Sequence, residues 1–373
     1  MRALTFGVEE EFLLLDPANG YPVPQAGTLL GLLRGRPEPR AELMRFQFEL
    51  ATGVCTTADE LEHELAGQRR LGADAARAGG CRLVASGVQP YGRPTLAFLT
   101  DHPRYREMAR RFPALTAVSG TCGCHVHVGV PSRALRVRAL AELRPWLATL
   151  LAISANSPVQ DGGDSGWASR RFAMISRWPT ARAPGLLTGP DEYDYVVRTM
   201  IARGGAVDER GIYLLARLSP SLPTVEIRVA DVCPDVETAL LVAILSRALV
   251  MTAGVRARIG IPAPHPSSAA VDAALDAAAR HGMAGPAIDP FNGRTTSPWQ
   301  MTERLLDHAG AALRSSGDDQ RAEKLLIRLR ELGTGADRQR TALTHAASPG
   351  EFIAALAGED PRATPARSPG RAR

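Results

Sequence analysis

The sequence has almost no lysine. Lys324 is the only one, and arginine supplies the rest of the 44 basic residues. No Gly-x-x-x-x-Gly-Lys-[Ser/Thr] motif is present, and a single lysine late in the chain could not complete one, which excludes a P-loop nucleotide site. No Gly-x-Gly-x-x-Gly motif follows a predicted strand either. Any site for a nucleotide must therefore be of another type.

Cysteines and long apolar runs are also scarce. Five cysteines in 373 residues do not make a disulfide framework. No N-terminal segment combines a basic start with an apolar core, so we expect no signal peptide. The most apolar helix candidate, residues 238–255, contains Arg247 and is shorter than a helix that spans a bilayer. We therefore expect no membrane partner and a cytoplasmic location.

The charge balance argues against nucleic-acid binding. The net charge is +5 and aromatic residues make up 5% of the chain, and a modest arginine excess with few aromatics is weak evidence for such a partner. Arginines that bind the phosphates of a small ligand explain the excess equally well. Part of the excess lies in residues 358–373, which lack large apolar side chains and are predicted to form a disordered basic tail.

What the sequence does contain is a run of three glutamates inside a predicted buried strand. Residues 5–15 read Thr-Phe-Gly-Val-Glu-Glu-Glu-Phe-Leu-Leu-Leu, and strand alternation places Glu9 and Glu11 on one face and Glu10 on the other. Two carboxylates side by side repel each other and lose hydration when they are buried. A divalent cation is the simplest compensation. The alternative is an edge strand with solvated glutamates, against which the flanking apolar residues argue.

Three more predicted strands carry polar groups two residues apart. They are Gln47 and Glu49 in residues 45–51, His125 and His127 in residues 122–130, and Glu226 and Arg228 in residues 224–229. If all four strands belong to one sheet with aligned polar faces, they form a concave surface that holds carboxylates, imidazoles and an arginine. Taken alone, a His-x-His strand can be a structural pair and a Glu-x-Arg strand a surface ion pair. The recurrence on four strands favours a site.

The donor set favours hard divalent cations. Carboxylates with one imidazole suit Mg²⁺ or Mn²⁺ rather than Zn²⁺, which prefers sulfur and nitrogen. Cys122 and Cys124 would project to the face opposite His125 and His127, so a structural zinc site is disfavoured. Hard cations on a carboxylate platform with nearby arginines fit phosphoryl transfer from ATP, because the metals bridge phosphate oxygens and guanidinium groups offset the developing charge.

The remaining pattern mixes strands and helices and then turns helical. A capping box at residues 57–60 predicts a helix to about residue 77, and residues 133–154 predict a helix with a kink at Pro145. Further strands are predicted at residues 81–88, 171–177 and 213–217, and further helices at 193–202, 236–254, 268–281, 298–314, 318–332 and 336–346. This order indicates an α+β fold with an antiparallel sheet.

Five segments, in order along the chain, carry a family resemblance. They are residues 7–12, 45–55, 123–129, 154–158 and 222–231. Together they resemble the carboxylate-amine ligase family, whose members are similar to the second type of glutamate–cysteine ligase and share the glutamine synthetase-like fold. The resemblance spans residues 5–347. It implies a curved antiparallel sheet whose concave face binds ATP and two or three Mg²⁺ ions, with helices packed on the other face, and one catalytic domain over residues 1–357.

The resemblance also implies roles for individual residues. Glu9, Glu11, Glu49, His127 and Glu226 fall on the family's metal-ligand positions. Arg228 faces the nucleotide phosphates, with Arg217 and His125 also assigned to the nucleotide site. Arg170 and Arg171 are candidates to hold the substrate carboxylate or a phosphate, and surface arginines are the alternative for both.

The implied reaction is amide formation in two steps, from an amino-acid carboxylate and an amine, with glutamate and cysteine as the default pair. The chain departs from the family pattern where Leu215 replaces aspartate, Ser221 replaces histidine and Arg171 replaces tryptophan. Two alternatives stay open: a metal-dependent His-x-His hydrolase, and a nucleotide-binding homologue without turnover. A homo-oligomer is plausible on family grounds alone.

Overall fold

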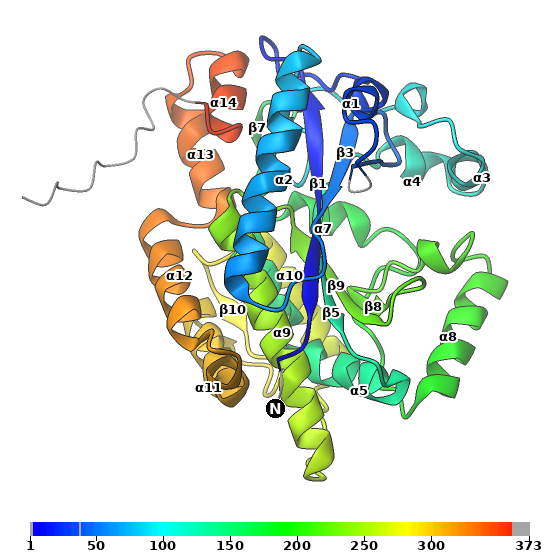
Figure 1. Cartoon of the computed structure of the whole chain (residues 1–373), viewed down its shortest axis with the longest axis vertical. Helices are drawn as coiled ribbons and strands as arrows, with labels where there is room; N and C mark the ends of the chain where they lie inside the picture. The colour runs from blue at the N-terminus through cyan, green and yellow to red at the C-terminus, as the bar shows by residue number, and fades with distance from the viewer. Residues whose placement is uncertain (1–2, 37–38, 360–373) are drawn as a thin grey trace, which may run out of the picture.

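The computed structural model describes residues 3–36 and 39–359, and its central feature is an antiparallel sheet (Figure 1). The strands run in the order β2-β3-β1-β5-β9-β8, and β4 pairs with the far end of β1. Their bounds are β1 (Phe6–Leu15), β2 (Arg40–Ala41), β3 (Gln47–Ala51), β4 (Arg82–Val84), β5 (Gly123–Gly129), β8 (Ala216–Leu218) and β9 (Thr224–Asp231). The four predicted polar strands are therefore neighbours in one sheet, which confirms the α+β class.

Helices lie between the strands of this sheet along the chain and follow its last strand. The part of the chain before β8 contributes α1 (Ala26–Leu32), α2 (Ala58–Ala78), α3 (Pro103–Arg111), α4 (Pro113–Ala117), α5 (Arg133–Leu143), α6 (Leu147–Ser154), α7 (Arg170–Ile175) and α8 (Pro190–Ala202). The part after β9 contributes α9 (Val236–Arg258), α10 (Ser268–His281), α11 (Pro298–Ser316), α12 (Asp319–Leu332), α13 (Gly335–His345) and α14 (Pro349–Leu356). Two small two-stranded sheets pair β6 (Val159–Gln160) with β7 (Gly163–Asp164) and β10 (Ala287–Ile288) with β11 (Thr295–Thr296).

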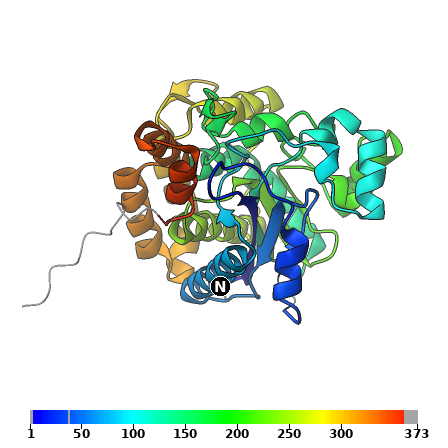
Figure 2. The same cartoon turned by 90° about the horizontal axis from the view of Figure 1, so that it is seen from above.

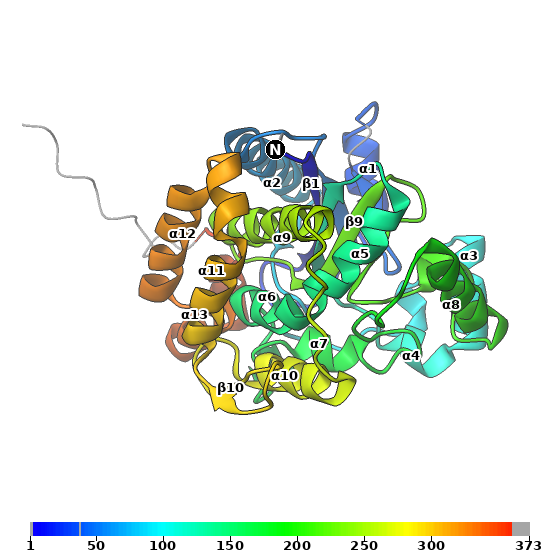
Figure 3. The same ribbon diagram turned by 90° about the horizontal axis from the view of Figure 1, so that it is seen from below.

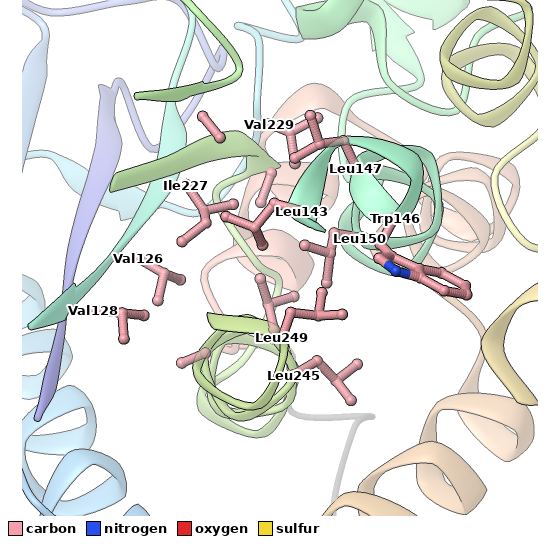
Figure 4. Close-up of a cluster of buried hydrophobic side chains, with 14 of the residues drawn as sticks. Val126, Val128, Leu143, Trp146, Leu147, Leu150, Ile227, Val229, Leu245 and Leu249 are labelled. Atoms are coloured by element: carbon pink, nitrogen blue, oxygen red, sulfur yellow. The ribbon is translucent and has the colours of Figure 1, made fainter. Parts of the chain in front are cut away.

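The apolar face of the sheet packs on helices. Figure 4 shows side chains of β5 and β9 in contact with residues of α5, α6 and α9, and with the turn that joins α5 to α6. The labelled residues from the strands are Val126, Val128, Ile227 and Val229, and each alternates with a polar residue on the opposite face. Burial of these branched side chains supplies most of the driving force that holds the layers together. One face of the sheet is therefore buried in the core.

The two flanks of the sheet carry different helices. In Figures 2 and 3 the helices α3 and α4 lie on one side of the molecule, and the orange and red helices α12 and α13 lie on the other. Figure 3 also shows α9 running beside α2 across the middle of the molecule. The polar face of the sheet is therefore bordered by the α3–α4 segment, while the late helices complete the core.

The structure corrects one local prediction and bears out the break predicted at Pro145. Residues 171–177 were expected to form a strand, but residues 170–175 form the helix α7, because the Ser169 hydroxyl accepts a hydrogen bond from the Phe172 N–H and caps its first turn. Residues 133–154 divide at Pro145 into α5, a 3₁₀ turn over Arg144–Trp146, and α6. Proline lacks the N–H that a continuous helix would need at this position.

The helix α9 is longer than predicted. It has 23 residues, and its most apolar stretch of 18 residues has a mean hydropathy of 1.9, so by length and composition it could cross a bilayer, and the expectation that it was too short is wrong. Inside the protein, however, 94% of its most apolar stretch is buried. Its Arg247 side chain donates to the Thr56 carbonyl at 2.8 Å and pairs with Asp318. The helix is therefore the central helix of the core.

The predicted basic tail lies almost wholly outside the described residues, which end at Glu359. The Glu359 carboxylate accepts a hydrogen bond at 3.0 Å from the Arg82 guanidinium, next to β4. The chain is therefore still attached to the sheet at the point where the description ends.

Candidate functional site

The register of β1 with its two neighbours places predicted site residues side by side. Glu11 lies opposite Glu49 in the β1–β3 pair, and Glu9 lies opposite His125 in the β1–β5 pair. Residues that face each other across an antiparallel pair share one face of the sheet. These four side chains therefore project to the polar face, as the alternation in the sequence predicts.

The other half of the sheet continues the same face. His127 lies opposite Glu226 in the β5–β9 pair, and Arg217 lies opposite Glu226 in the β8–β9 pair. Arg228 follows Glu226 by two residues on β9 and shares its face. Polar side chains thus run across five adjacent strands without an apolar residue being forced into solvent.

The middle glutamate of the first strand has a separate role. Glu10 projects to the opposite face, where it accepts hydrogen bonds at 2.8 Å and 2.5 Å from the Arg69 guanidinium of α2. Arg69 also donates to the Cys233 carbonyl. This carboxylate is therefore balanced by an ion pair within the protein.

The polar face forms the floor of a cavity of about 510 Å³. Its walls come from the segment around β2, from α3, from α7 and from the segment before β8. Nine of the ten residues expected in the site line it: Glu9, Glu11, Glu49, His125, His127, Arg171, Arg217, Glu226 and Arg228. The tenth, Arg170, is not among the lining residues, and its Nε donates to the Gln160 side chain at 2.7 Å instead. The tertiary structure therefore separates the two adjacent arginines.

Two groups of possible metal ligands lie in this cavity. The first acidic group consists of Glu9, His127 and Glu226. In each of the two groups, the possible ligand atoms all lie within 4.8 Å of one another. His127 Nε2 is 3.4 Å from a Glu9 carboxylate oxygen. The other ring nitrogen of His127 is 2.9 Å from the Thr224 hydroxyl, which fixes the orientation of the ring. His127 Nε2 is buried and has no hydrogen-bond partner, so it is free to bind a ligand.

The second acidic group consists of Glu11, Glu42 and Glu49. Glu11 accepts a hydrogen bond at 2.7 Å from the Gly123 N–H, and Glu42 accepts one at 3.1 Å from the Leu43 N–H. Sequence analysis missed Glu42, which follows the two-residue strand β2. A strand of two residues is too short to show an alternation of polar and apolar side chains. Glu42 reaches the cavity only because β2 lies beside β3.

The pKa values differ between the two groups. Burial, followed by repulsion from Glu42, raises the pKa of Glu11 to about 7. Burial raises the pKa of Glu42 as well, and burial together with the other carboxylates raises the pKa of Glu49 well above its ordinary value. Three carboxylates this close resist simultaneous ionisation unless a cation joins them. The second acidic group therefore has a deficit of positive charge.

The first acidic group is balanced from within the chain. Burial would raise the pKa of Glu226, but Arg228 and Arg217 outweigh burial and hold this pKa well below its ordinary value. Arg217 donates to both Glu226 oxygens, at 2.8 Å and 3.2 Å, and Arg228 also pairs with Glu226. For Glu9, the imidazoles of His125 and His127 overcome the effect of burial and lower the pKa. These carboxylates are ready to bind a cation in their charged form.

The surroundings of His125 favour its neutral form. Burial, followed by the charge of Arg228, lowers the pKa of His125 to about 3. Its Nδ1 lies 3.3 Å from Arg228, and its Nε2 is buried without a hydrogen-bond partner. A neutral imidazole next to a guanidinium can accept a hydrogen bond and help to hold that arginine in place.

Arg171 lines the cavity with its guanidinium bound to the backbone. Its Nη1 donates to the Val229 carbonyl at 3.3 Å and its Nη2 to the Arg228 carbonyl at 3.2 Å. A Cβ at position 123 would collide with this guanidinium, so only glycine allows β5 to approach it so closely. Arg171 therefore ties α7 to β9 and adds positive charge beneath Arg228.

The outer part of the cavity is aromatic and apolar. Trp178 packs edge-on against Tyr213, with the ring centroids 5.3 Å apart, and Tyr105 of α3 lines the same wall. Leu215 and Ser221, two of the departures from the family pattern, also line the cavity. These two departures thus lie in the wall of the cavity that holds the acidic groups.

Comparison with known sequences identifies a family. The description of the matching family model is glutamate–cysteine ligase family 2, and the match covers residues 5–357. A relative from Saccharopolyspora erythraea, named "Putative glutamate–cysteine ligase 2-1", is 41% identical over 354 residues, which are 95% of this chain and 94% of the relative.

Solved structures share the fold at low sequence identity. The glutamate–cysteine ligase of Francisella tularensis, solved in complex with AMP, aligns with a TM-score of 0.70 and 13% identity, over 96% of this chain and 88% of the other. A bifunctional glutathione synthetase from Pasteurella multocida aligns with a TM-score of 0.67 and 14% identity, over 96% of this chain and 52% of the other. The sheet with one open polar face is therefore the glutamine synthetase-like fold of these ligases, as the resemblance implies.

Proposed function

The chain belongs to glutamate–cysteine ligase family 2 and is an ATP-dependent carboxylate–amine ligase, and we propose that its cavity joins the carboxylate of glutamate to an amine, by default that of cysteine, with Mg²⁺ at the two acidic groups. The observation that supports the metal role is the second acidic group, whose three closely spaced carboxylates have only the loosely held Arg40 beside them. An oxygen-rich donor set of this kind fits Mg²⁺ or Mn²⁺.

The reaction proceeds in two steps and needs no protein nucleophile. A carboxylate oxygen of the donor acid attacks the γ-phosphorus of ATP, the bond to the β–γ bridging oxygen breaks, and ADP leaves. The amine then attacks the acyl carbon of the acyl phosphate, phosphate departs with the electrons of the C–O bond, and the amine loses a proton. Mg²⁺ bound in the cavity would neutralise phosphate oxygens so that two anions can meet.

The residues of the chain supply positions and charge. Glu9, Glu49 and Glu226, with Glu11, Glu42 and His127, would hold the ions. Arg228 is fixed by Glu226 and His125, so its guanidinium is oriented before any phosphate arrives. A fixed cation at the point where charge develops lowers the barrier more than a mobile one, because it needs no reorganisation. Arg217 keeps Glu226 ionised and in place.

The aromatic wall offers a surface on which the substrates would rest. The donor carboxylate would approach Arg228 and the ions, while the rest of the acid and the amine would rest against Tyr105, Tyr213 and Leu215. Arg170 is left out of the proposed site because it does not line the cavity. Residues 1–357 would form one catalytic domain that acts in the cytoplasm on small molecules, with no nucleic-acid or membrane partner.

ADP release tests the proposal. The wild-type protein with ATP and Mg²⁺ should release ADP only when both an amino acid and an amine are present. Glu226→Ala should lower this rate by roughly 100-fold or more, since it removes a metal ligand and leaves Arg217 without its partner. Glu303→Ala, at an exposed glutamate of α11, is the matched control and should retain the wild-type rate.

Two outcomes would favour other functions. Nucleotide binding without ADP release across a broad panel of acids and amines would indicate a homologue without turnover, a reading motivated by Leu215 and Ser221 in the cavity wall. Amide hydrolysis without ATP would instead indicate a metal-dependent hydrolase. Circular dichroism of each variant checks that a loss of activity is not caused by a loss of folded structure.

A further inference from the structure

One arginine connects the two acidic groups. Arg40 lies on β2 opposite Glu49, and its Nη1 is 3.6 Å from a Glu49 oxygen and 3.9 Å from a Glu9 oxygen. Glu49 belongs to the second acidic group and Glu9 to the first. A single guanidinium therefore stands between the two places where cations are proposed to bind.

The contacts of Arg40 differ from those of the other cavity arginines. Arg217 and Arg228 pair with Glu226 at hydrogen-bond distance, and their side chains are 7% and 17% exposed. The side chain of Arg40 is 60% exposed, and both of its carboxylate contacts are longer than a hydrogen bond. Ion pairs of this exposed kind contribute little to stability and exchange readily. Arg40 is therefore a weakly bound cation in a strongly anionic part of the cavity.

Divalent ions at the two groups would change the surroundings of Arg40. Their charge would repel the guanidinium from Glu9 and Glu49, because like charges a few ångströms apart repel strongly in a partly buried site. The side chain would still be attached at the cavity wall beside β3. The groups that then need a positive partner are phosphate oxygens, for which the planar guanidinium fork is well suited.

We propose that Arg40 is the counter-cation of the metal-free cavity, that divalent ions displace it from Glu9 and Glu49, and that the displaced guanidinium then contacts the phosphates of the nucleotide. The inference rests on the proposed function, because it takes the acidic groups as the metal sites. It assigns the cationic side chain of Arg40 two successive anionic partners: the carboxylates before metal binding and the phosphates after it.

The test uses two binding measurements on the full chain, neither of which needs turnover. Without nucleotide, Arg40→Ala should bind Mn²⁺ roughly threefold to tenfold more tightly than the wild type, as followed by electron paramagnetic resonance, since a competing cation is gone. With saturating Mg²⁺, the same variant should bind a non-hydrolysable ATP analogue about tenfold more weakly, as followed by calorimetry. A purely structural role would not produce opposite signs.

Matched variants separate the outcomes. Arg210→Ala removes another exposed arginine from the lining of the same cavity, one that forms no ion pair with either acidic group, and should leave Mn²⁺ affinity within about twofold of wild type. Arg40→Gln, which keeps much of the side-chain volume, should reproduce both signs if Arg40→Ala folds poorly. Unchanged or weaker Mn²⁺ binding in the Arg40 variants would overturn the displacement, and unchanged nucleotide affinity would overturn the phosphate contact. Absence of Mn²⁺ binding in the wild type would overturn the proposed metal sites instead.

Discussion

The two acidic groups share one cavity but differ in how their charge is balanced. In the first, Glu226 is paired with Arg217 and Arg228, and its pKa is held low. In the second, the hydrogen bonds to Glu11 and Glu42 come from backbone N–H groups, and the pKa values of all three carboxylates are raised. The charge of the first group is therefore balanced by tightly paired arginines, whereas the second group has only the exposed Arg40 beside Glu49.

Charge-removing substitutions in the two groups should affect stability with opposite signs, and this is the largest expected effect. Glu226→Gln should lower the free energy of unfolding of the metal-free protein by about 3 kcal/mol, because the buried Arg217 loses its partner. Glu49→Gln should raise it by about 1 kcal/mol at pH 8, because repulsion among the closely spaced carboxylates of the second group falls. Urea unfolding in the presence of EDTA measures both. Destabilisation by both substitutions would contradict the difference drawn between the groups.

The stabilisation by Mg²⁺ should depend on pH in a defined direction. The pKa of Glu11 is raised to about 7, so folding favours its neutral form, and the stability of the metal-free protein falls as pH rises from the unfolded value of about 4.5 through 7. Mg²⁺ binds the carboxylate form. The increase in Tm caused by a fixed Mg²⁺ concentration should therefore be larger at pH 8 than at pH 6, by roughly 2 °C or more.

Differential scanning fluorimetry at several pH values measures this effect. Glu11→Gln removes one of the titrating carboxylates and is the matched control, so its Mg²⁺-dependent Tm shift should be smaller and depend less on pH than that of the wild type. An equal shift at pH 6 and pH 8 in the wild type would show that the second acidic group does not take up the ion.

The smallest expected effect on metal binding belongs to the third glutamate of the opening strand. Glu10 is balanced by Arg69 on the other face of the sheet. Glu10→Gln should leave the Mn²⁺ affinity within about twofold of wild type, although it should lower stability because Arg69 is left partly buried without its acid. Calorimetric titration with Mn²⁺ checks this. A large loss of Mn²⁺ binding would mean that the two faces of β1 are not independent.

The site residues that lie on strands could be predicted from the sequence, because successive side chains along a strand point to alternate faces. The two-residue spacing of Glu9 and Glu11, and of Glu226 and Arg228, already assigns each pair to one face. Apart from Glu10, which pairs with Arg69, the core-facing residues between and beside them are apolar, so the orientation of each strand is not ambiguous. Antiparallel pairing of these strands then places the polar face on one side.

Residues outside regular strands were harder to predict. Arg170 and Arg171 are adjacent in sequence, and no local pattern says that only Arg171 lines the cavity. That separation follows from the helix α7, where a strand was predicted. Glu42 has no periodic neighbours, and its place in the second acidic group depends on the pairing of β2 with β3, seven residues later.

The sequence by itself determined which faces of the strands are polar and that hard cations suit them, because both follow from side-chain chemistry and a period of two. Only the tertiary structure decided which carboxylates share a cation, which arginines are bound and which can exchange. Those properties depend on distances of a few ångströms between segments far apart in the chain, and on how much water each charge retains after packing. The difference between a balanced and an unbalanced group of acids is therefore a property of the fold.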